Sequence, residues 1–258
     1  MRAGHRLLIG GLLAMGVVVW LATGGSTAPA GPSQSATVAS ATSPSSATQS
    51  TSAATTVPKE TLVATMPTSG APAAHKPGGP IKLHIPGFWQ HGRSILPVIG
   101  QQGDWYHVRL AQRPNGSTAW VRSRYVVRLN TDPYHVVIDL SAMHMHLYKD
   151  GKQIGYFPLG IGVPADPTPR GHFFVAVFTA APSPAWGAFV ILTSAHSSVF
   201  TNWESTGDGI TGIHGPLGAD AQIGTTGARV SHGCVRMHKA QLLHLRPLPI
   251  GTPIDIHL

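Results

Sequence analysis

The segment Ser231-His232-Gly233-Cys234-Val235-Arg236-Met237 holds the only cysteine of this 258-residue chain, and the motif Gly212-Ile213-His214-Gly215 precedes it. A thiol attacks well only as thiolate, and its free pKa of about 8.5 leaves little thiolate at neutral pH. A histidine beside the thiol can take the proton and later return it to a leaving amine. The backbone amides of Gly233 and Cys234 are candidate donors to an oxyanion. The segment therefore predicts a catalytic cysteine and not a buried structural one.

The N-terminus indicates export from the cytoplasm. Arg2, His5 and Arg6 precede an uncharged apolar run, Leu7 to Thr23, and Ala28-Pro29-Ala30 then resembles a signal-peptidase site. The run lies at the lower limit for a spanning helix. Residues 1–24 are thus either a cleaved signal peptide or an uncleaved membrane anchor, and the folded part is expected in the cell envelope. A single cysteine in an exported protein is either inert or kept for its chemistry.

Residues 25–80 are rich in Ala, Ser, Thr, Pro and Gly, and we predict a disordered linker there because large apolar side chains are few. The net charge of +8 is spread along the chain and forms no basic run in the folded part. Nucleic acid is therefore not an expected partner. A basic protein outside the membrane fits anionic wall polymers, although the charge is equally consistent with a role in solubility alone.

Short apolar strands separated by turns are predicted from Ile81 to about residue 130. Gly103-Asp104-Trp105-Tyr106-His107-Val108, with Ala119-Trp120-Val121 further on, resembles the bacterial Src-homology-type small barrel. The resemblance implies a module that binds peptide or cell wall, and a structural spacer fits the pattern equally well.

Longer strands are predicted over residues 132–258. Val136, Ile138 and Leu140 alternate with other residues, and Asp150-Gly151 predicts a tight hairpin. The run His238 to Leu245 is the one convincing helix, and Ile254 to Leu258 closes the chain as a strand. The fold class is therefore mainly β: a small N-terminal barrel followed by a β-rich sandwich with one or two short helices. No histidine spacing matches a zinc site, so neither a metal nor a cofactor is expected.

Residues 134–258 resemble the YkuD-type L,D-transpeptidase family, in which a His-Gly pair precedes a Ser-His-Gly-Cys block. The stretches Val137-Ile138-Asp139-Leu140 and Thr168-Pro169-Arg170-Gly171-His172-Phe173 also fit this family. Two positions depart from its pattern: Pro216 stands where a small hydroxyl residue is frequent, and Arg170 stands where threonine is common.

The resemblance implies a role for each matching residue. Cys234 becomes the nucleophile and His214 the general base, while His232 supports the oxyanion site. Arg236 either meets a substrate carboxylate or forms a structural salt bridge. The remaining candidates for oxyanion or substrate binding are Ser231, Gly233 and Gly215.

The reaction implied is attack on the third residue of a peptidoglycan tetrapeptide stem, release of D-Ala, and resolution of the thioester by a neighbouring stem to give a 3→3 cross-link. The family resemblance also implies a role in wall synthesis and cell shape and acylation by carbapenems. Water as acceptor would make the chain an L,D-carboxypeptidase, and a protein amine would make it an anchoring enzyme. A non-catalytic wall-binding protein and a metal-dependent peptidase are alternatives from other classes.

Overall fold

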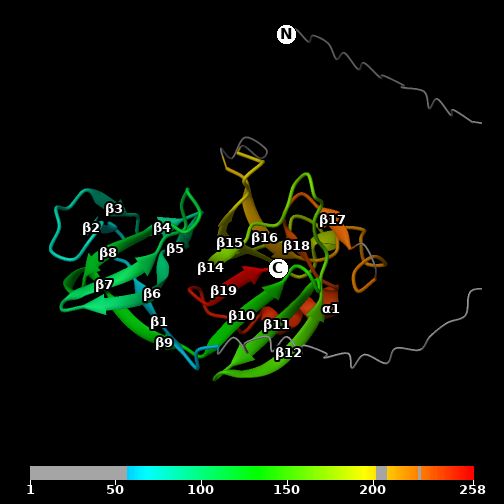
Figure 1. The fold of residues 1–258 in the computed structure, drawn as a ribbon, viewed down its shortest axis with the longest axis horizontal. Coiled ribbons are helices and arrows are strands. Elements are labelled where there is room, and N and C mark those ends of the chain that lie inside the picture. Colours follow the sequence, from blue (N-terminus) through cyan, green and yellow to red (C-terminus); the bar gives the residue numbers. More distant parts are fainter. Residues whose placement is uncertain (1–56, 202–207, 226–227) are drawn as a thin grey trace, which may run out of the picture. The chain divides into compact units, whose positions relative to one another are not determined.

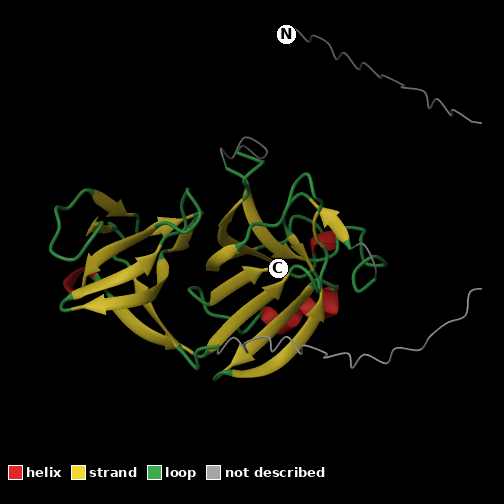
Figure 2. Cartoon of the chain, in the orientation of Figure 1, coloured by secondary structure: helices red, strands yellow, loops and turns green. Residues whose placement is uncertain are grey.

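A computed structural model of the chain describes residues 57–201, 208–225 and 228–258. Strands make up most of the regular structure, and helix is confined to short segments such as α1 (Lys239–Leu242) (Figure 2). The fold is therefore mainly β, as the sequence predicts. The predicted helix of residues 238–245 is confirmed in its position: α1 runs directly into a 3-10 turn, Leu243–Leu245.

A seven-stranded sheet, called here the N-terminal sheet, has the strand order β3-β2-β8-β7-β6-β1-β9 (Figure 1). Its buried side chains are mostly small or aliphatic, which allows short strands to pack closely. Its strands are β1 (Thr61–Thr65), β2 (Ala71–Ala74), β3 (Leu83–Ile85), β6 (Ile95–Gln102), β7 (Trp105–Arg109), β8 (Thr118–Arg122) and β9 (Arg128–Asp132).

The predicted linker of residues 25–80 is wrong for residues 57–80, which contribute β1 and β2 to this sheet. Alanines explain the error. A segment rich in alanine has the composition of a linker, but Ala64, Ala71 and Ala73 are fully buried in the sheet. The N-terminal strands accordingly begin at Thr61 and not at Ile81. Residues 25–56, and the predicted signal or anchor segment, lie outside the described residues.

The second sheet, called the C-terminal sheet, has eight strands in the order β12-β11-β10-β19-β14-β15-β16-β18 (Figure 1). The closing strand β19 inserts between β10, to which it is parallel, and β14, to which it is antiparallel. The strands are β10 (Tyr134–Asp139), β11 (His144–Lys149), β12 (Lys152–Pro158), β14 (Gly171–Thr179), β15 (Val190–His196), β16 (Ile210–His214), β18 (Val235–Arg236) and β19 (Pro253–His257).

The hairpin between β11 and β12 confirms the turn prediction. Asp150 and Gly151 have φ angles of 52° and 72°, the left-handed values that a type I′ turn requires at both positions. A further two-stranded pair consists of β13 (Ile161–Gly162) and β17 (Arg229–Ser231), which are parallel. It places Ser231, at the start of the cysteine segment, opposite Gly162.

Strand β14 contributes to the cores on both sides of it. Side chains alternate across a strand, so Phe173 and Val175 enter the core of the C-terminal sheet, whereas Phe174 and Ala176 pack in the core of the N-terminal sheet. Phe174 is 1% exposed. The continuous apolar run of the sequence at this point therefore reflects two buried faces.

Candidate active site

His214, the last residue of β16, is held by a backbone acceptor. Its Nδ1 lies 2.7 Å from the carbonyl oxygen of Gly215, and only a protonated Nδ1 can donate to that oxygen. The neutral ring therefore carries its proton on Nδ1 and leaves Nε2 as an acceptor. The indole of Trp186 packs against the imidazole with ring centroids 4.4 Å apart. His214 is 1% exposed, and burial lowers its pKa to about 4, with the positive charge of Arg236 adding to the shift.

Cys234 directly precedes β18, which pairs in parallel with β16. The register places Ile213 opposite Val235 and His214 opposite Arg236. Because side chains alternate along a strand, Cys234 and His214 are expected on the same face of this pair. The thiol is partly exposed and accepts a hydrogen bond from the amide of Gly212 at 3.3 Å.

Burial raises the pKa of the Cys234 thiol, an effect that the Gly212 amide and the Arg236 charge partly oppose. The thiol pKa is raised and the imidazole pKa is lowered, so both groups are neutral in the resting protein near pH 7. The thiol and the imidazole therefore form no preformed ion pair in the resting protein.

Both residues line one cavity of about 390 Å³, called here the Cys234 cavity. Its wall combines apolar side chains, such as Val190 and Leu192, with polar and charged ones, and such a mixture can hold a small ligand or a peptide. The residues that line it include His214, Gln90, Trp186, Asp208, Ser231, His232, Cys234 and Arg236.

Ser231 organises the turn before the cysteine. Its hydroxyl donates to the carbonyl oxygen of Cys234 at 2.5 Å and accepts from the amide of Gly233 at 3.2 Å. The side chain is buried, and both of these hydrogen bonds lie within residues 231–234. Ser231 therefore fixes the loop that carries the thiol, and its contact with substrate or the oxyanion stays a prediction. The Gly233 amide likewise already has a partner.

Gly215, which the sequence predicts to bind substrate or the oxyanion, is not among the residues that line the Cys234 cavity. Its amide donates to the carbonyl oxygen of Trp186 at 2.7 Å, and a Cβ at this position would lie 2.7 Å from the Gly187 nitrogen. Glycine is needed here for close backbone packing. Because the carbonyl of Gly215 orients the imidazole, Pro216 in place of a hydroxyl residue does not deprive His214 of its partner.

Arg236 and His232 are predicted to act on substrate and lie on the cavity wall. Arg236 forms no ion pair with any residue that the structure describes; its nearest acceptor is the carbonyl of Pro216 at 3.5 Å. Within the described ranges, therefore, no acidic side chain forms the structural salt bridge that was the alternative role for Arg236. The side chain of His232 is 59% exposed, and its ring stands edge-on to Phe200 with centroids 5.6 Å apart.

Two positioning residues escaped the sequence analysis. Trp186 sits in Ser183-Pro184-Ala185-Trp186-Gly187, which is recognisable from sequence only as a turn. Gly212 opens the motif that contains His214, but no sequence signal shows that its amide bonds the thiol. Within residues 57–201, 208–225 and 228–258, no group of three or more His, Cys, Asp or Glu side chains is arranged to hold a metal ion. The same residues contain no helix long and apolar enough to cross a membrane.

The geometry thus defines a cysteine–histidine site on a mainly β scaffold. Residues 133–256 match the YkuD family, described as the L,D-transpeptidase catalytic domain. YqjB of Bacillus subtilis (strain 168), a protein named as an L,D-transpeptidase, is 30% identical over 132 residues, which cover 48% of this chain and 71% of YqjB. YkuD of Bacillus licheniformis is 28% identical over 128 residues, or 49% of this chain and 67% of that protein.

An L,D-transpeptidase structure from Mycobacterium smegmatis aligns over 63% of this chain and 82% of its own length, with 18% identity and a TM-score of 0.39. The catalytic domain of an Enterococcus faecium L,D-transpeptidase aligns over 49% of this chain and 98% of its own length, with 26% identity and a TM-score of 0.34. On the match of residues 133–256 and the similarity to YqjB, the chain belongs to the YkuD-type L,D-transpeptidase family.

Proposed function

We propose that this chain is a cysteine-dependent peptidoglycan L,D-transpeptidase that forms 3→3 cross-links through an acyl-enzyme on Cys234. One observation carries the proposal. The thiol of Cys234 and the imidazole of His214 line the same cavity, and the hydrogen bond from Nδ1 to Gly215 leaves Nε2 free to accept a proton.

In the first half-reaction, Nε2 of His214 takes the thiol proton while Sγ of Cys234 attacks the carbonyl carbon of the third residue, a diamino acid, of a tetrapeptide stem. The amide of Cys234 is the better oxyanion donor of the two predicted ones, since the amide of Gly233 is bonded to Ser231. Collapse of the tetrahedral intermediate breaks the peptide bond. The departing D-Ala amine takes the proton back from His214, and a thioester remains.

In the second half-reaction, the side-chain amine of a neighbouring stem attacks the thioester carbonyl. His214 accepts a proton from this amine and returns one to the departing sulfur, which restores the thiol. The lowered imidazole pKa keeps His214 neutral, and therefore able to accept a proton, each time a nucleophile arrives.

Arg236 is proposed to bind the terminal carboxylate of the stem. It lies on the cavity wall, has no acidic partner among the described residues, and a guanidinium matches carboxylate geometry. The chain is proposed to act outside the cytoplasm, where peptidoglycan stems occur, and its net charge of +8 suits an anionic wall.

The direct test is to incubate the protein with a soluble tetrapeptide and to separate the products by chromatography and mass spectrometry. A transpeptidase yields free D-Ala and a dimer joined by a 3→3 bond. Release of D-Ala with tripeptide alone would identify an L,D-carboxypeptidase, and dimer formed only with an added protein amine would identify an anchoring enzyme. A protein that releases no D-Ala contradicts the proposed function.

A further inference from the structure

One residue on the wall of the Cys234 cavity comes from the N-terminal part of the chain. Gln90 stands at the tip of a hairpin formed by β4 (Phe88–Trp89) and β5 (Gly92–Arg93), far from Cys234 in sequence. Trp89 pairs with Gly92, so Gln90 and His91 are the two turn residues. Gln90 is exposed, which leaves its side-chain amide accessible to a bound molecule.

The backbone of this turn is strained, which favours a functional role for its side chains. Gln90 and His91 have φ angles of 45° and 66°, in the left-handed region that glycine and asparagine tolerate far better. Neither residue is the type that this turn normally selects. Strained non-glycine residues cluster at functional sites, where their side chains make contacts that glycine, which adopts positive φ without strain, cannot make.

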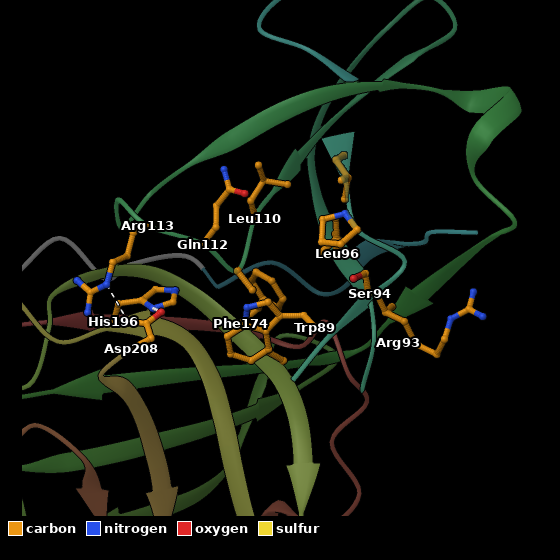
Figure 3. A pocket seen from close by; sticks show the side chains of 15 residues that line it. Trp89, Arg93, Ser94, Leu96, Leu110, Gln112, Arg113, Phe174, His196 and Asp208 are labelled. Atoms are coloured by element: carbon orange, nitrogen blue, oxygen red, sulfur yellow. Dashed lines mark hydrogen bonds and ion pairs between the residues drawn. The ribbon is translucent and has the colours of Figure 1, made fainter. Parts of the chain in front are cut away.

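Close contacts fix the hairpin against the C-terminal sheet. A Cβ on Gly92 would lie 2.5 Å from Val177 of β14, so the hairpin backbone packs directly on that strand. The indole of Trp89 stands edge-on to the ring of His196, with centroids 6.3 Å apart. Figure 3 shows Trp89 close to Phe174, and His196 beside Asp208, in the small cavity behind the hairpin.

A second link ties the β7–β8 loop of the N-terminal sheet to the same region. Arg113 donates to a carboxylate oxygen of Asp208 at 2.8 Å, an interaction drawn in Figure 3, and Asp208 also lines the Cys234 cavity. Asn115 bonds to the backbone of His196 in both directions, at 2.8 and 2.9 Å. The position of Gln90 relative to the cavity is therefore set by several independent contacts.

We propose that Gln90 is a substrate-binding residue: its side-chain amide hydrogen-bonds a backbone amide of the donor stem peptide while Cys234 is acylated. A carboxamide both donates and accepts, which matches the N–H and C=O groups of a peptide bond. The inference rests on the proposed function and adds to it, because it makes the N-terminal part of the chain a component of the active site.

The test compares two glycine substitutions in the same turn of the full-length protein. Both Gln90→Gly and His91→Gly relieve the left-handed backbone and should raise the melting temperature. Only Gln90 lines the cavity, so Gln90→Gly should lower kcat/KM for acylation by a soluble tetrapeptide about tenfold, the usual effect of losing one hydrogen bond. The kcat/KM of His91→Gly for the same reaction should stay within about twofold of the wild-type value. Gln90→Asn, which keeps the carboxamide, should recover part of the loss.

Alkylation of Cys234 by iodoacetamide supplies the second readout, because it reports the reactivity of the thiol and requires no bound stem peptide. Equal alkylation rates in wild type and all variants, together with the loss in Gln90→Gly alone, support the inference. Equal acylation by Gln90→Gly and His91→Gly overturns it, and so does a parallel loss of alkylation, which would indicate a structural effect. If wild type alkylates normally but is not acylated by the tetrapeptide, the proposed function itself fails.

Discussion

Nδ1 of His214 donates to the carbonyl oxygen of the next residue, Gly215, at 2.7 Å. The third member of this cysteine–histidine arrangement is thus a backbone carbonyl and not an acidic side chain. A carbonyl fixes the tautomer and the ring orientation without supplying a full negative charge. Burial outweighs the opposing effect of this hydrogen bond and lowers the imidazole pKa to about 4.

The first prediction concerns the identity of the base. His214→Gln should lower the rate of tetrapeptide acylation by roughly 10²-fold or more, the usual contribution of general-base catalysis. His232→Gln should cost much less, since His232 is mostly exposed at the cavity rim. Stopped mixing followed by mass spectrometry measures both rates. A greater loss in the His232 variant would reverse the assignment of the base.

The second prediction links the same pKa to stability. Between pH 6.5 and pH 4 the unfolded chain binds a proton at His214 that the folded chain does not, so stability must fall as the pH falls through that window. At pH 4.5 wild type should have lost about 2–3 kcal/mol of unfolding free energy from this group relative to pH 7. Urea unfolding of wild type and His214→Gln at both pH values isolates the effect. Identical pH dependence in the two proteins would contradict the assigned pKa.

The third prediction tests the backbone contact at Gly215. In Gly215→Ala the new methyl group meets backbone atoms of Trp186 and Gly187 at 2.7 Å, so the carbonyl that holds His214 must move. We expect a loss of about 1–3 kcal/mol in stability and a fall in acylation of tenfold or more. Gly100→Ala is the matched control, because its Cβ meets only ordinary contacts at 3.5 Å and lies in the N-terminal sheet. Acylation that is equally slow in both variants would disprove the positioning role.

The fourth prediction concerns the boundary between the two sheets. A fragment starting at residue 133 would uncover Phe174, which is buried in the core of the N-terminal sheet. We expect this fragment to be less stable than residues 57–258, because an exposed phenylalanine loses about 1.5–3 kcal/mol of burial. Phe174→Thr should destabilise residues 57–258 and improve the solubility of the fragment. Thermal unfolding and sedimentation measure both effects, and a fragment as stable as the longer protein would show that the sheets are independent.

The sequence was most informative where chemistry dictates residue type. Cys234 and His214 could be singled out because a lone cysteine in a glycine-containing polar segment has few structural explanations, and both line one cavity. The Asp150-Gly151 turn was predictable because few residue pairs tolerate left-handed backbone at both positions. The inferences about Cys234 and the turn depend on local sequence, whereas the choice of His214 as the base depended on the family resemblance.

Other features depend on contacts that sequence does not reveal. The buried role of Ser231 arises from a turn geometry that the motif alone does not specify. In β6 the apolar residue Ile99 is exposed, because an irregularity between Val98 and Gly100 shifts the register of the strand. Gln90 belongs to a hairpin whose turn residues are atypical, so no turn signal marked it. The error in the linker prediction also comes from contacts that the sequence does not reveal, because the burial of an alanine depends on how closely the strands approach each other.

The mass of the intact protein after exposure to a carbapenem tests whether Cys234 forms a covalent acyl-enzyme. Carbapenems are proposed to acylate the thiol and leave a stable adduct, whereas a tetrapeptide thioester is expected to turn over. We expect one added carbapenem per wild-type chain, located on Cys234 by peptide mapping. We expect none on Cys234→Ala, which should remain folded because a small residue replaces a small one. An adduct of the same mass on Cys234→Ala, or an unmodified wild-type protein, would contradict the cysteine acyl-enzyme.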